Sequence, residues 1–117
     1  MGLDQWAFAR PPGRVHEDQE IMYWRKHSAL HGWMTDLAID RKIVKDPSDF
    51  NVVEIQLTAE DIERLEHERF NMRRKFGFFF GNTEESYQRF EKQDYDFIKQ
   101  AKDYLDQGYV IIYTSWW

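Results

Sequence analysis

The sequence predicts an α+β domain in which three helices pack on a small β-sheet. Three segments carry apolar residues at helical spacing, and two shorter segments are rich in β-branched and aromatic residues. In chain order the pattern is helix, strand, helix, extended segment, helix, strand. That order is typical of a small sheet whose helices cover one face.

The first 18 residues are expected to form an N-terminal arm, and residues 19–117 a single α+β domain. The PPG sequence at 11–13 interrupts any regular element. Trp6 and Phe8 would anchor the arm to the domain, and a flexible tail is the alternative. The arm has no apolar run long enough for a signal peptide or a membrane helix.

The predicted helices follow from apolar periodicity and from their end signals. The first two are expected at about Glu20–Ala38 and Thr58–Arg74. The third is expected to begin after a cap at Asn82 or Thr83 and to end before Gly108. The apolar face of the first helix would hold Met22, Tyr23, Leu30, Trp33, Met34 and Leu37. The third helix has the clearest pattern, with Tyr87, Phe90, Phe97, Ile98, Ala101, Tyr104 and Leu105 on one face.

The remaining segments are predicted to be strands and loops. FNVVEIQL at 50–57 and YVIIYTSWW at 109–117 have the composition of strands. KFGFFFGN at 75–82 is expected to be a buried extended segment between tight turns. RKIVKDPSD at 41–49 is expected to be a loop or a short strand and turn.

Composition excludes several classes of function. Sixteen Lys and Arg against 21 Asp and Glu give a net charge of −5, which disfavours general nucleic-acid or anionic-membrane binding. The absence of cysteine removes disulfides and thiolate metal sites. Aromatic residues make up 17% of the chain, so some are expected on a binding surface. No cofactor is predicted.

Several charged residues fall on faces that should be apolar. In the predicted helices, Lys26, Arg69 and Arg73 point toward the core, and Asp94 lies on the apolar face of the third helix. In one interpretation, Lys26 or Arg69 forms a structural ion pair with Asp94. In the other, the three cations converge on a cavity that receives a phosphate or carboxylate.

The second interpretation predicts a binding site for a phosphate-bearing small molecule. Aromatic side chains of the first helix would stack on a base or another flat group, and His31 would contact a sugar or phosphate edge. The predicted ligand-binding residues are Tyr23, Trp24, Lys26, His31, Trp33, Arg69 and Arg73.

Metal binding and catalysis have weaker support. His27 and His31 have a spacing that can bind zinc, but HSALH lacks the glutamate of the HExxH signature. A pair of histidines at the surface or at a ligand's edge is preferred, and no metal site is predicted. The sequence contains no Walker loop and no nucleophile elbow, so no catalytic residue is assigned.

YWRKHSALHGW at 23–33, GFFFGNTEE at 77–85 and IIYTSWW at 111–117 resemble a family of small proteins encoded by tailed bacteriophages. Its members carry YWRKxxxxHxW and GFFFGxTE motifs. The similarity covers about residues 20–117. The chain departs from the pattern in its N-terminal extension and in the RRK that precedes GFFFG. The resemblance implies a phage protein made in the cytoplasm of an infected bacterium.

Small phage proteins of this kind often antagonise bacterial defence. The first expectation is therefore a non-catalytic anti-defence protein, a homo-oligomer that sequesters a nucleotide or an ADP-ribose-type signal. The second is a protein-interaction module that inhibits a host protein through its N-terminal arm and the Trp116–Trp117 end. The third is a small enzyme acting on a nucleotide. None of them requires a membrane.

Overall fold

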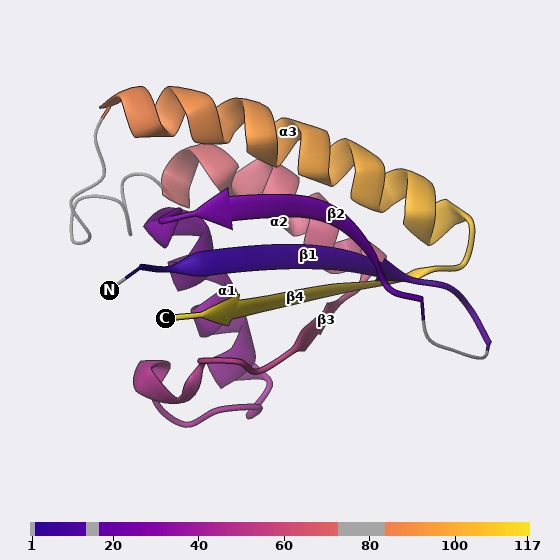
Figure 1. The fold of residues 1–117 in the computed structure, drawn as a ribbon, viewed down its shortest axis with the longest axis horizontal. Helices are drawn as coiled ribbons and strands as arrows, with labels where there is room; N and C mark the ends of the chain where they lie inside the picture. The colour runs from indigo at the N-terminus through magenta and orange to yellow at the C-terminus, as the bar shows by residue number, and fades with distance from the viewer. Residues whose placement is uncertain (1, 14–16, 73–83) are drawn as a thin grey trace.

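The computed structural model describes residues 2–13, 17–72 and 84–117, with the backbone alone for 69–72 and 84–88. The α+β prediction is confirmed, because three α-helices pack on a four-stranded antiparallel sheet of order β2-β1-β4-β3. In Figure 1 the sheet lies nearest the viewer, with α1 and α2 behind it and α3 along its upper edge. The elements are β1 (Asp4–Arg10), β2 (Gln19–Arg25), α1 (Ser28–Asp40), η1 (Pro47–Asp49), β3 (Ile55–Leu57), α2 (Ala59–Met72), α3 (Glu84–Asp106) and β4 (Val110–Trp116).

The prediction of an N-terminal arm is wrong for residues 4–10. They form β1, which lies inside the sheet and pairs antiparallel with both β2 and β4. Its buried positions are Gln5, Ala7 and Ala9, each with no exposed surface. Because the side chains facing the helices are small or polar, the strand lacks the buried apolar alternation by which strands are identified from sequence.

The predicted start of the first helix is also wrong. Residues 19–25 form β2 and α1 begins only at Ser28, so YWRK lies in a strand and a turn. Pairing with β1 stabilises the strand, with Tyr23 opposite Trp6. At the turn, Lys26 has a φ of 60° and an exposed side chain. The prediction that Lys26 points toward the core is therefore wrong.

Elements with strong local signals match their predictions. At the start of α2 the Thr58 hydroxyl accepts from the Asp61 amide, and the Asp61 carboxylate accepts from the Thr58 amide. After α3, Gly108 has a φ of 86° and ends the helix as expected. β4 forms as predicted, β3 covers only the last part of the predicted strand, and the predicted extended segment at 75–82 lies outside the described residues.

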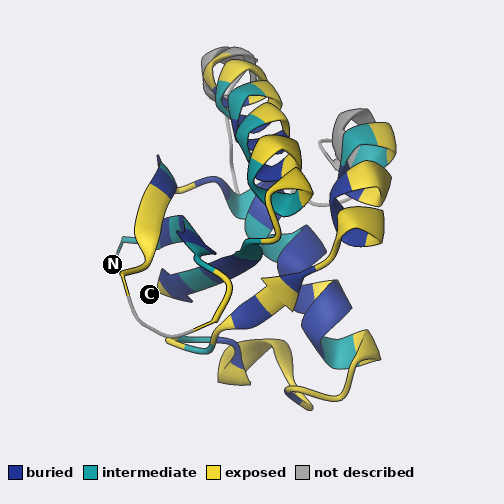
Figure 2. Ribbon diagram, turned by 90° about the vertical axis from the view of Figure 1, so that its right-hand side faces the viewer, coloured by how far each residue is buried: buried dark blue, intermediate teal, exposed yellow. Residues whose placement is uncertain are grey.

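The buried residues lie between the sheet and the helices, which Figure 2 shows in dark blue. Phe90, Phe97, Ile98 and Ala101 from α3 contribute as predicted, whereas the side chain of Tyr87 is not described. α3 also covers the outer edge of β2, where Gln93 and Gln100 donate hydrogen bonds to the carbonyl oxygens of Tyr23 and Ile21. None of the helices in the described ranges combines the length and apolar character needed to cross a bilayer.

Asp94 is buried, and Lys26 is not among its partners in the described part of the chain. Its carboxylate accepts a hydrogen bond from Trp24 Nε1 at 3.1 Å and contacts His27 Nε2 at 2.8 Å. The His27 ring also stacks on Phe90, with ring centroids 4.1 Å apart. The carboxylate therefore links β2, the start of α1 and α3. Arg69 was the other predicted partner, and its side chain is not described.

Asp94→Ala should reduce the free energy of unfolding by about 3–5 kcal/mol, because it leaves the His27 and Trp24 nitrogens without their acceptor in a buried site. Chemical denaturation measures this loss. Asp103→Ala, an exposed aspartate on the same helix, is the matched control and should change stability by about 0.5 kcal/mol or less. Equal stability of the two variants would show that the contact is not structural.

Candidate functional site

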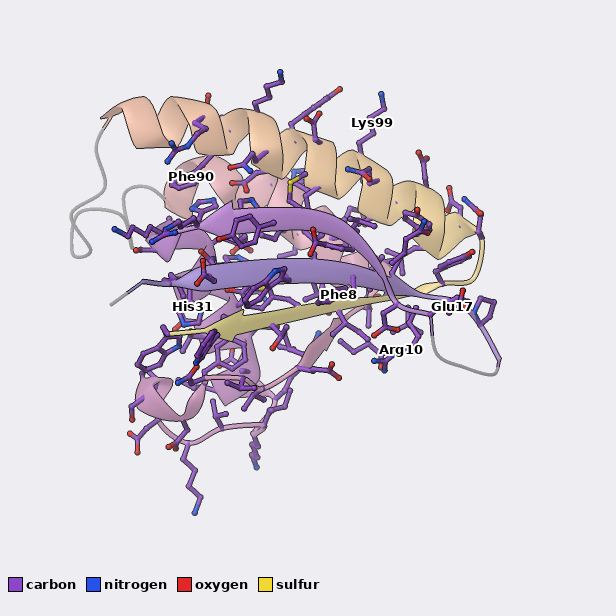
Figure 3. All side chains as sticks on the ribbon, viewed as in Figure 1. Phe8, Arg10, Glu17, His31, Phe90 and Lys99 are labelled. Carbon is purple, nitrogen blue, oxygen red and sulfur yellow. The ribbon has the colours of Figure 1, made fainter. Side chains whose placement is uncertain are left out.

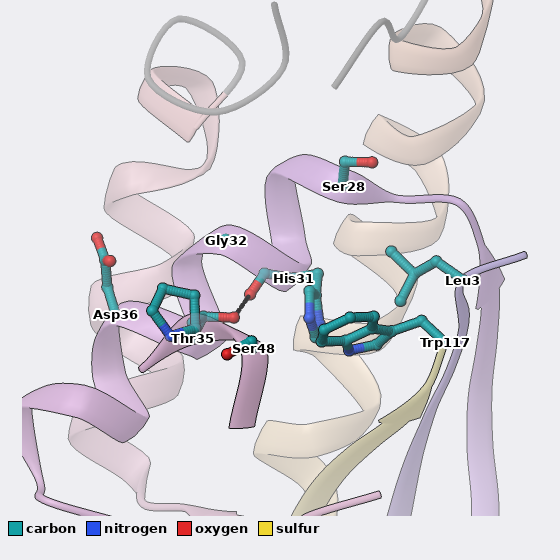
Figure 4. Close-up of a pocket in the computed structure, with 9 residues that line it drawn as sticks. Leu3, Ser28, His31, Gly32, Thr35, Asp36, Ser48 and Trp117 are labelled. Atoms are coloured by element: carbon teal, nitrogen blue, oxygen red, sulfur yellow. Dashed lines mark hydrogen bonds between the residues drawn. The ribbon is translucent and has the colours of Figure 1, made fainter. Parts of the chain in front are cut away.

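A pocket of about 510 Å³ lies where the first residues of the chain, α1, η1 and the residue after β4 meet. Figure 4 shows it with the Trp117 indole as one wall and α1 as another. The pocket is lined by Leu3, Ser28, His31, Gly32, Thr35, Asp36, Pro47, Ser48 and Trp117.

The strand register brings the two ends of the described chain to this pocket. Asp4 on β1 pairs with Trp116 on β4, which places Leu3 and Trp117 side by side. Trp117 is then held by three hydrogen bonds: its amide and carbonyl bind the Asn51 side chain, and its Nε1 donates to the Phe50 carbonyl at 2.9 Å. The indole wall is therefore fixed before any ligand arrives.

One face of α1 forms the second wall. The lining residues at 28, 31, 32, 35 and 36 have the i, i+3, i+4 spacing that places side chains on a single helical face. Gly32, which has no side chain, lies at the middle of this row of lining residues. Opposite it, η1 contributes Pro47 and Ser48, and reciprocal Asp46 and Asp49 hydrogen bonds cap this short helix.

His31 is the titratable ring of the pocket. Its Nδ1 lies 2.9 Å from the Tyr113 hydroxyl, and its ring stacks on buried Phe50 with centroids 5.4 Å apart. Burial lowers the pKa of His31 from its ordinary 6.5 to about 4. Burial likewise raises the pKa of Tyr113. Both side chains are therefore uncharged at neutral pH.

The electrostatics of the pocket favour an uncharged ligand. No lysine or arginine is among the described residues that line it, and Asp36 contributes a carboxylate. Leu3, Pro47 and the Trp117 indole supply apolar walls, while Ser28, Thr35 and Ser48 supply small polar groups. An apolar cavity with a few polar groups is the usual form of a small-molecule site.

Of the predicted ligand-binding residues whose side chains the structure describes, only His31 lines this pocket. Trp24 is fully buried in the core with its Nε1 bound to Asp94, so its ring is not a surface for stacking. Trp33 is buried between α1 and α2, donates to Glu68 Oε1 at 3.1 Å and contacts the Arg64 guanidinium.

The other predicted residues are dispersed. Tyr23 lies on the helix-free face of the sheet, where its hydroxyl donates to Asp4. Lys26 is at the turn before α1, and its backbone amide donates to the carbonyl of Leu3, a lining residue of the pocket. The side chain of Arg69 and all of Arg73 lie outside the described residues. The predicted convergence of three cations therefore does not include Lys26 as an inward-facing residue.

Sequence reasoning missed most of this site. The sequence predicts Trp117 only as part of a protein-interaction surface at the Trp116–Trp117 end, and Leu3 only as part of the N-terminal arm. One available signal was Gly32, because a glycine inside a helical pattern often marks a packing or binding position. No local pattern connects residues 3, 31, 48 and 117, which meet only in the folded chain.

The histidine pair does not form a metal site. His27 is turned into the core toward Asp94, whereas His31 faces the pocket and Tyr113. Within the described ranges, no group of three or more histidine, aspartate or glutamate side chains is arranged to hold a metal ion.

Comparison of the chain with protein-family models, curated proteins and solved structures gives no match.

His31 should make stability depend on pH. Between pH 6.5 and about 4 the unfolded chain binds a proton on this imidazole that the folded chain excludes. The free energy of unfolding should therefore fall by about 2–3 kcal/mol as pH falls through this range, and be fully restored above pH 6.5. Denaturation of the wild type and His31→Gln at pH 7 and pH 4 measures the difference.

The matched control is His67→Gln, which removes an exposed imidazole from α2 and should leave the wild-type pH dependence in place. A wild-type slope that His31→Gln does not reduce would mean that the imidazole titrates normally.

Proposed function

We propose that this protein is a non-catalytic binding protein that holds a nucleotide-like molecule by its base in the pocket between α1, η1 and Trp117. Its biological role would be that of a bacteriophage anti-defence protein, which sequesters a phosphate-bearing nucleotide or an ADP-ribose-type signal in the infected cell. The observation that carries the proposal is the pocket itself, with its fixed indole wall and its uncharged imidazole.

The dimensions and lining of the pocket suit a base. Its volume of about 510 Å³ falls in the usual range for small-molecule sites, about 300–1,000 Å³. Stacking of a base on an aromatic side chain contributes about 1–3 kcal/mol in nucleic-acid systems. Because three hydrogen bonds already hold Trp117, little conformational entropy is lost when a flat ring packs against it.

The phosphate would lie at the mouth of the pocket, away from Asp36. α1 starts at Ser28, and its first turn has neither a side-chain cap nor an acidic residue. The backbone amides of a helix N-terminus favour an anion. Lys26 is two residues away, and its hydrogen bond to Leu3 keeps it beside the pocket wall. Lys26 thus remains a proposed phosphate contact, from the turn and not from a helix face.

Adenosine, AMP and ADP-ribose should bind the wild-type protein and quench its tryptophan fluorescence. Gly32→Leu, which fills the centre of the pocket, should weaken binding at least tenfold. Lys99→Leu places the same side chain on the exposed face of α3, where Figure 3 shows Lys99 pointing into solvent, and should bind like the wild type.

Three outcomes separate the candidate functions. Intact ligand recovered after denaturation supports sequestration, and chemically altered ligand supports a small nucleotide-acting enzyme. If no ligand of the panel binds, or if Gly32→Leu binds as well as the wild type, this pocket is not a nucleotide site.

A second candidate function is supported by the face of the sheet that no helix covers. Four aromatic side chains, Trp6, Phe8, Tyr23 and Trp116, lie on this open sheet face, which is nearest the viewer in Figure 1. Trp116 is 63% exposed and Tyr23 39%. The rings of Trp6 and Tyr23 are 5.7 Å apart, so the patch is continuous across β1 and β2. A contiguous exposed apolar patch is typical of a protein interface.

The occupant we propose for the open sheet face is a second copy of this chain. Two charged groups on the same face have partners within the chain: Arg10 binds Asp18 through two hydrogen bonds of 2.8 Å, and Asp4 accepts from the Tyr23 hydroxyl. An apolar patch whose neighbouring charged groups already have partners can pack against a second copy of itself, as a two-fold interface requires. A single-stranded nucleic acid would instead require a positively charged groove.

Tyr23→Ser combined with Trp116→Ser should convert a homodimer to a monomer, as measured by light scattering after size-exclusion chromatography. The matched control is Ile43→Ser combined with Tyr95→Ser, which removes two exposed apolar side chains outside the open sheet face. A wild type that is monomeric at every concentration tested would exclude the homodimer. Equal dissociation in both double variants would exclude this face as the interface.

A further inference from the structure

A chain of buried hydrogen bonds leads from the centre of the sheet to the pocket. It begins at Gln5, whose side chain is fully buried on β1. The Gln5 Oε1 accepts from the His27 backbone amide at 2.8 Å, and a backbone amide can only donate. The orientation of the side-chain amide is therefore determined. Its Nε2 donates to the His27 carbonyl at 3.0 Å and to the Tyr113 hydroxyl oxygen at 3.1 Å.

The direction of the next hydrogen bond follows. An amide nitrogen cannot accept, so the hydroxyl hydrogen of Tyr113 is not directed to Gln5. Ser115 Oγ, a second hydroxyl near Tyr113, makes no hydrogen bond among the described residues. The Tyr113 hydrogen is therefore available to His31 Nδ1, at 2.9 Å. Burial keeps the phenol protonated by raising its pKa, and it keeps the imidazole neutral. A neutral imidazole that accepts at Nδ1 carries its proton on Nε2.

We propose that Gln5 and Tyr113 fix His31 in the Nε2–H tautomer, so that the pocket binds an uncharged flat heterocycle through a ring nitrogen or carbonyl oxygen that accepts the Nε2–H hydrogen bond. The two nitrogens flank the Cε1 atom of the imidazole, and their hydrogen-bond directions diverge widely in the plane of the ring. Since Nδ1 points inward to Tyr113, Nε2 points away from it, toward the pocket that His31 lines beside Trp117 (Figure 4). The ligand class deepens the proposed function and rests on one part of it, the assignment of this pocket as the binding site, whereas the tautomer does not depend on it.

This arrangement gives the pocket a chemical preference as well as a shape. A heterocycle that presents an unprotonated ring nitrogen or a carbonyl satisfies the Nε2–H group, whereas a ring without an acceptor leaves that donor unpaired when it displaces water. Gln5 and Tyr113 act as positioning residues, because neither lines the pocket. The Nε2–H group would donate a hydrogen bond to an acceptor on the edge of a base, while the phosphate of a nucleotide would lie outside the pocket.

The tautomer is tested directly by two-bond ¹H–¹⁵N correlation spectra of the histidine rings at pH 7, without any ligand. The wild type should show His31 as a single Nε2–H tautomer. Tyr113→Phe removes the hydroxyl and should yield a mixture of both tautomers at His31. The proposal that Gln5 and Tyr113 fix the tautomer would be overturned if the wild type showed an Nδ1–H tautomer or a charged ring at His31. It would also be overturned if the Tyr113→Phe spectrum were identical to that of the wild type.

The ligand class is tested with a matched pair of flat rings, isoquinoline and naphthalene, which have the same shape and differ in one ring nitrogen. At pH 7.5 the wild type should bind isoquinoline about threefold to tenfold more tightly than naphthalene, the range expected for one hydrogen bond. His31→Phe keeps a flat ring without the donor and should abolish or reverse this preference. Equal binding of the two rings by the wild type, or no binding of either, would overturn the proposed ligand class.

These readouts separate the two proposals. If isoquinoline is preferred and the Nε2–H tautomer is found, but adenosine and ADP-ribose do not bind, the nucleotide function fails and the heterocycle site stands. If Tyr113→Phe does not fold, the wild-type tautomer and the isoquinoline preference still decide the inference.

Discussion

The structure depends on the way β1 and α3 together hold His27. The Gln5 amide satisfies both the backbone amide and the backbone carbonyl of His27, and the Asp94 carboxylate contacts its imidazole. His27 immediately precedes α1 and follows the left-handed turn at Lys26. Because these partners are buried, water cannot replace them, and a shift of α1 would leave several polar groups unpaired. The angle at which α1 leaves the sheet is therefore set by hydrogen bonds as well as by apolar packing.

The hydrogen bonds that hold His27 also determine the position of the pocket wall. With the start of α1 fixed on the sheet, the face that carries His31 and Gly32 is directed toward η1 and Trp117. His31 is then supported from behind by Tyr113 and Phe50, both buried in the core. The cavity wall is thus continuous with the interior of the protein. A site supported in this way keeps its geometry when empty, which lowers the entropic cost of binding.

The two faces of the sheet have different roles. The inner face holds the core, while the open sheet face carries Trp6, Phe8, Tyr23 and Trp116. The outer edge of β2 is protected from unwanted strand pairing, because Gln93 and Gln100 bind its carbonyl oxygens. Trp116 and Trp117 are adjacent in the chain, one on the open sheet face and the other in the pocket wall. The end of β4 consequently lies between the two proposed binding surfaces.

The sequence by itself determined the α+β class, α2, α3 and β4, because their signals are local: the Thr58 cap, the apolar stripe of α3, the glycine at 108 and a β-branched run. Only the tertiary structure decided that residues 4–10 and 19–25 are strands, since their pairing joins segments far apart and the buried side of β1 carries glutamine and alanine. The tertiary structure also places the Lys26 side chain at the surface, and it shows that the Asp94 carboxylate contacts Trp24 and His27. Of the candidate site, His31 alone was predicted within the pocket, because a cavity assembled from residues 3, 28–36, 47–48 and 117 has no sequence spacing of its own.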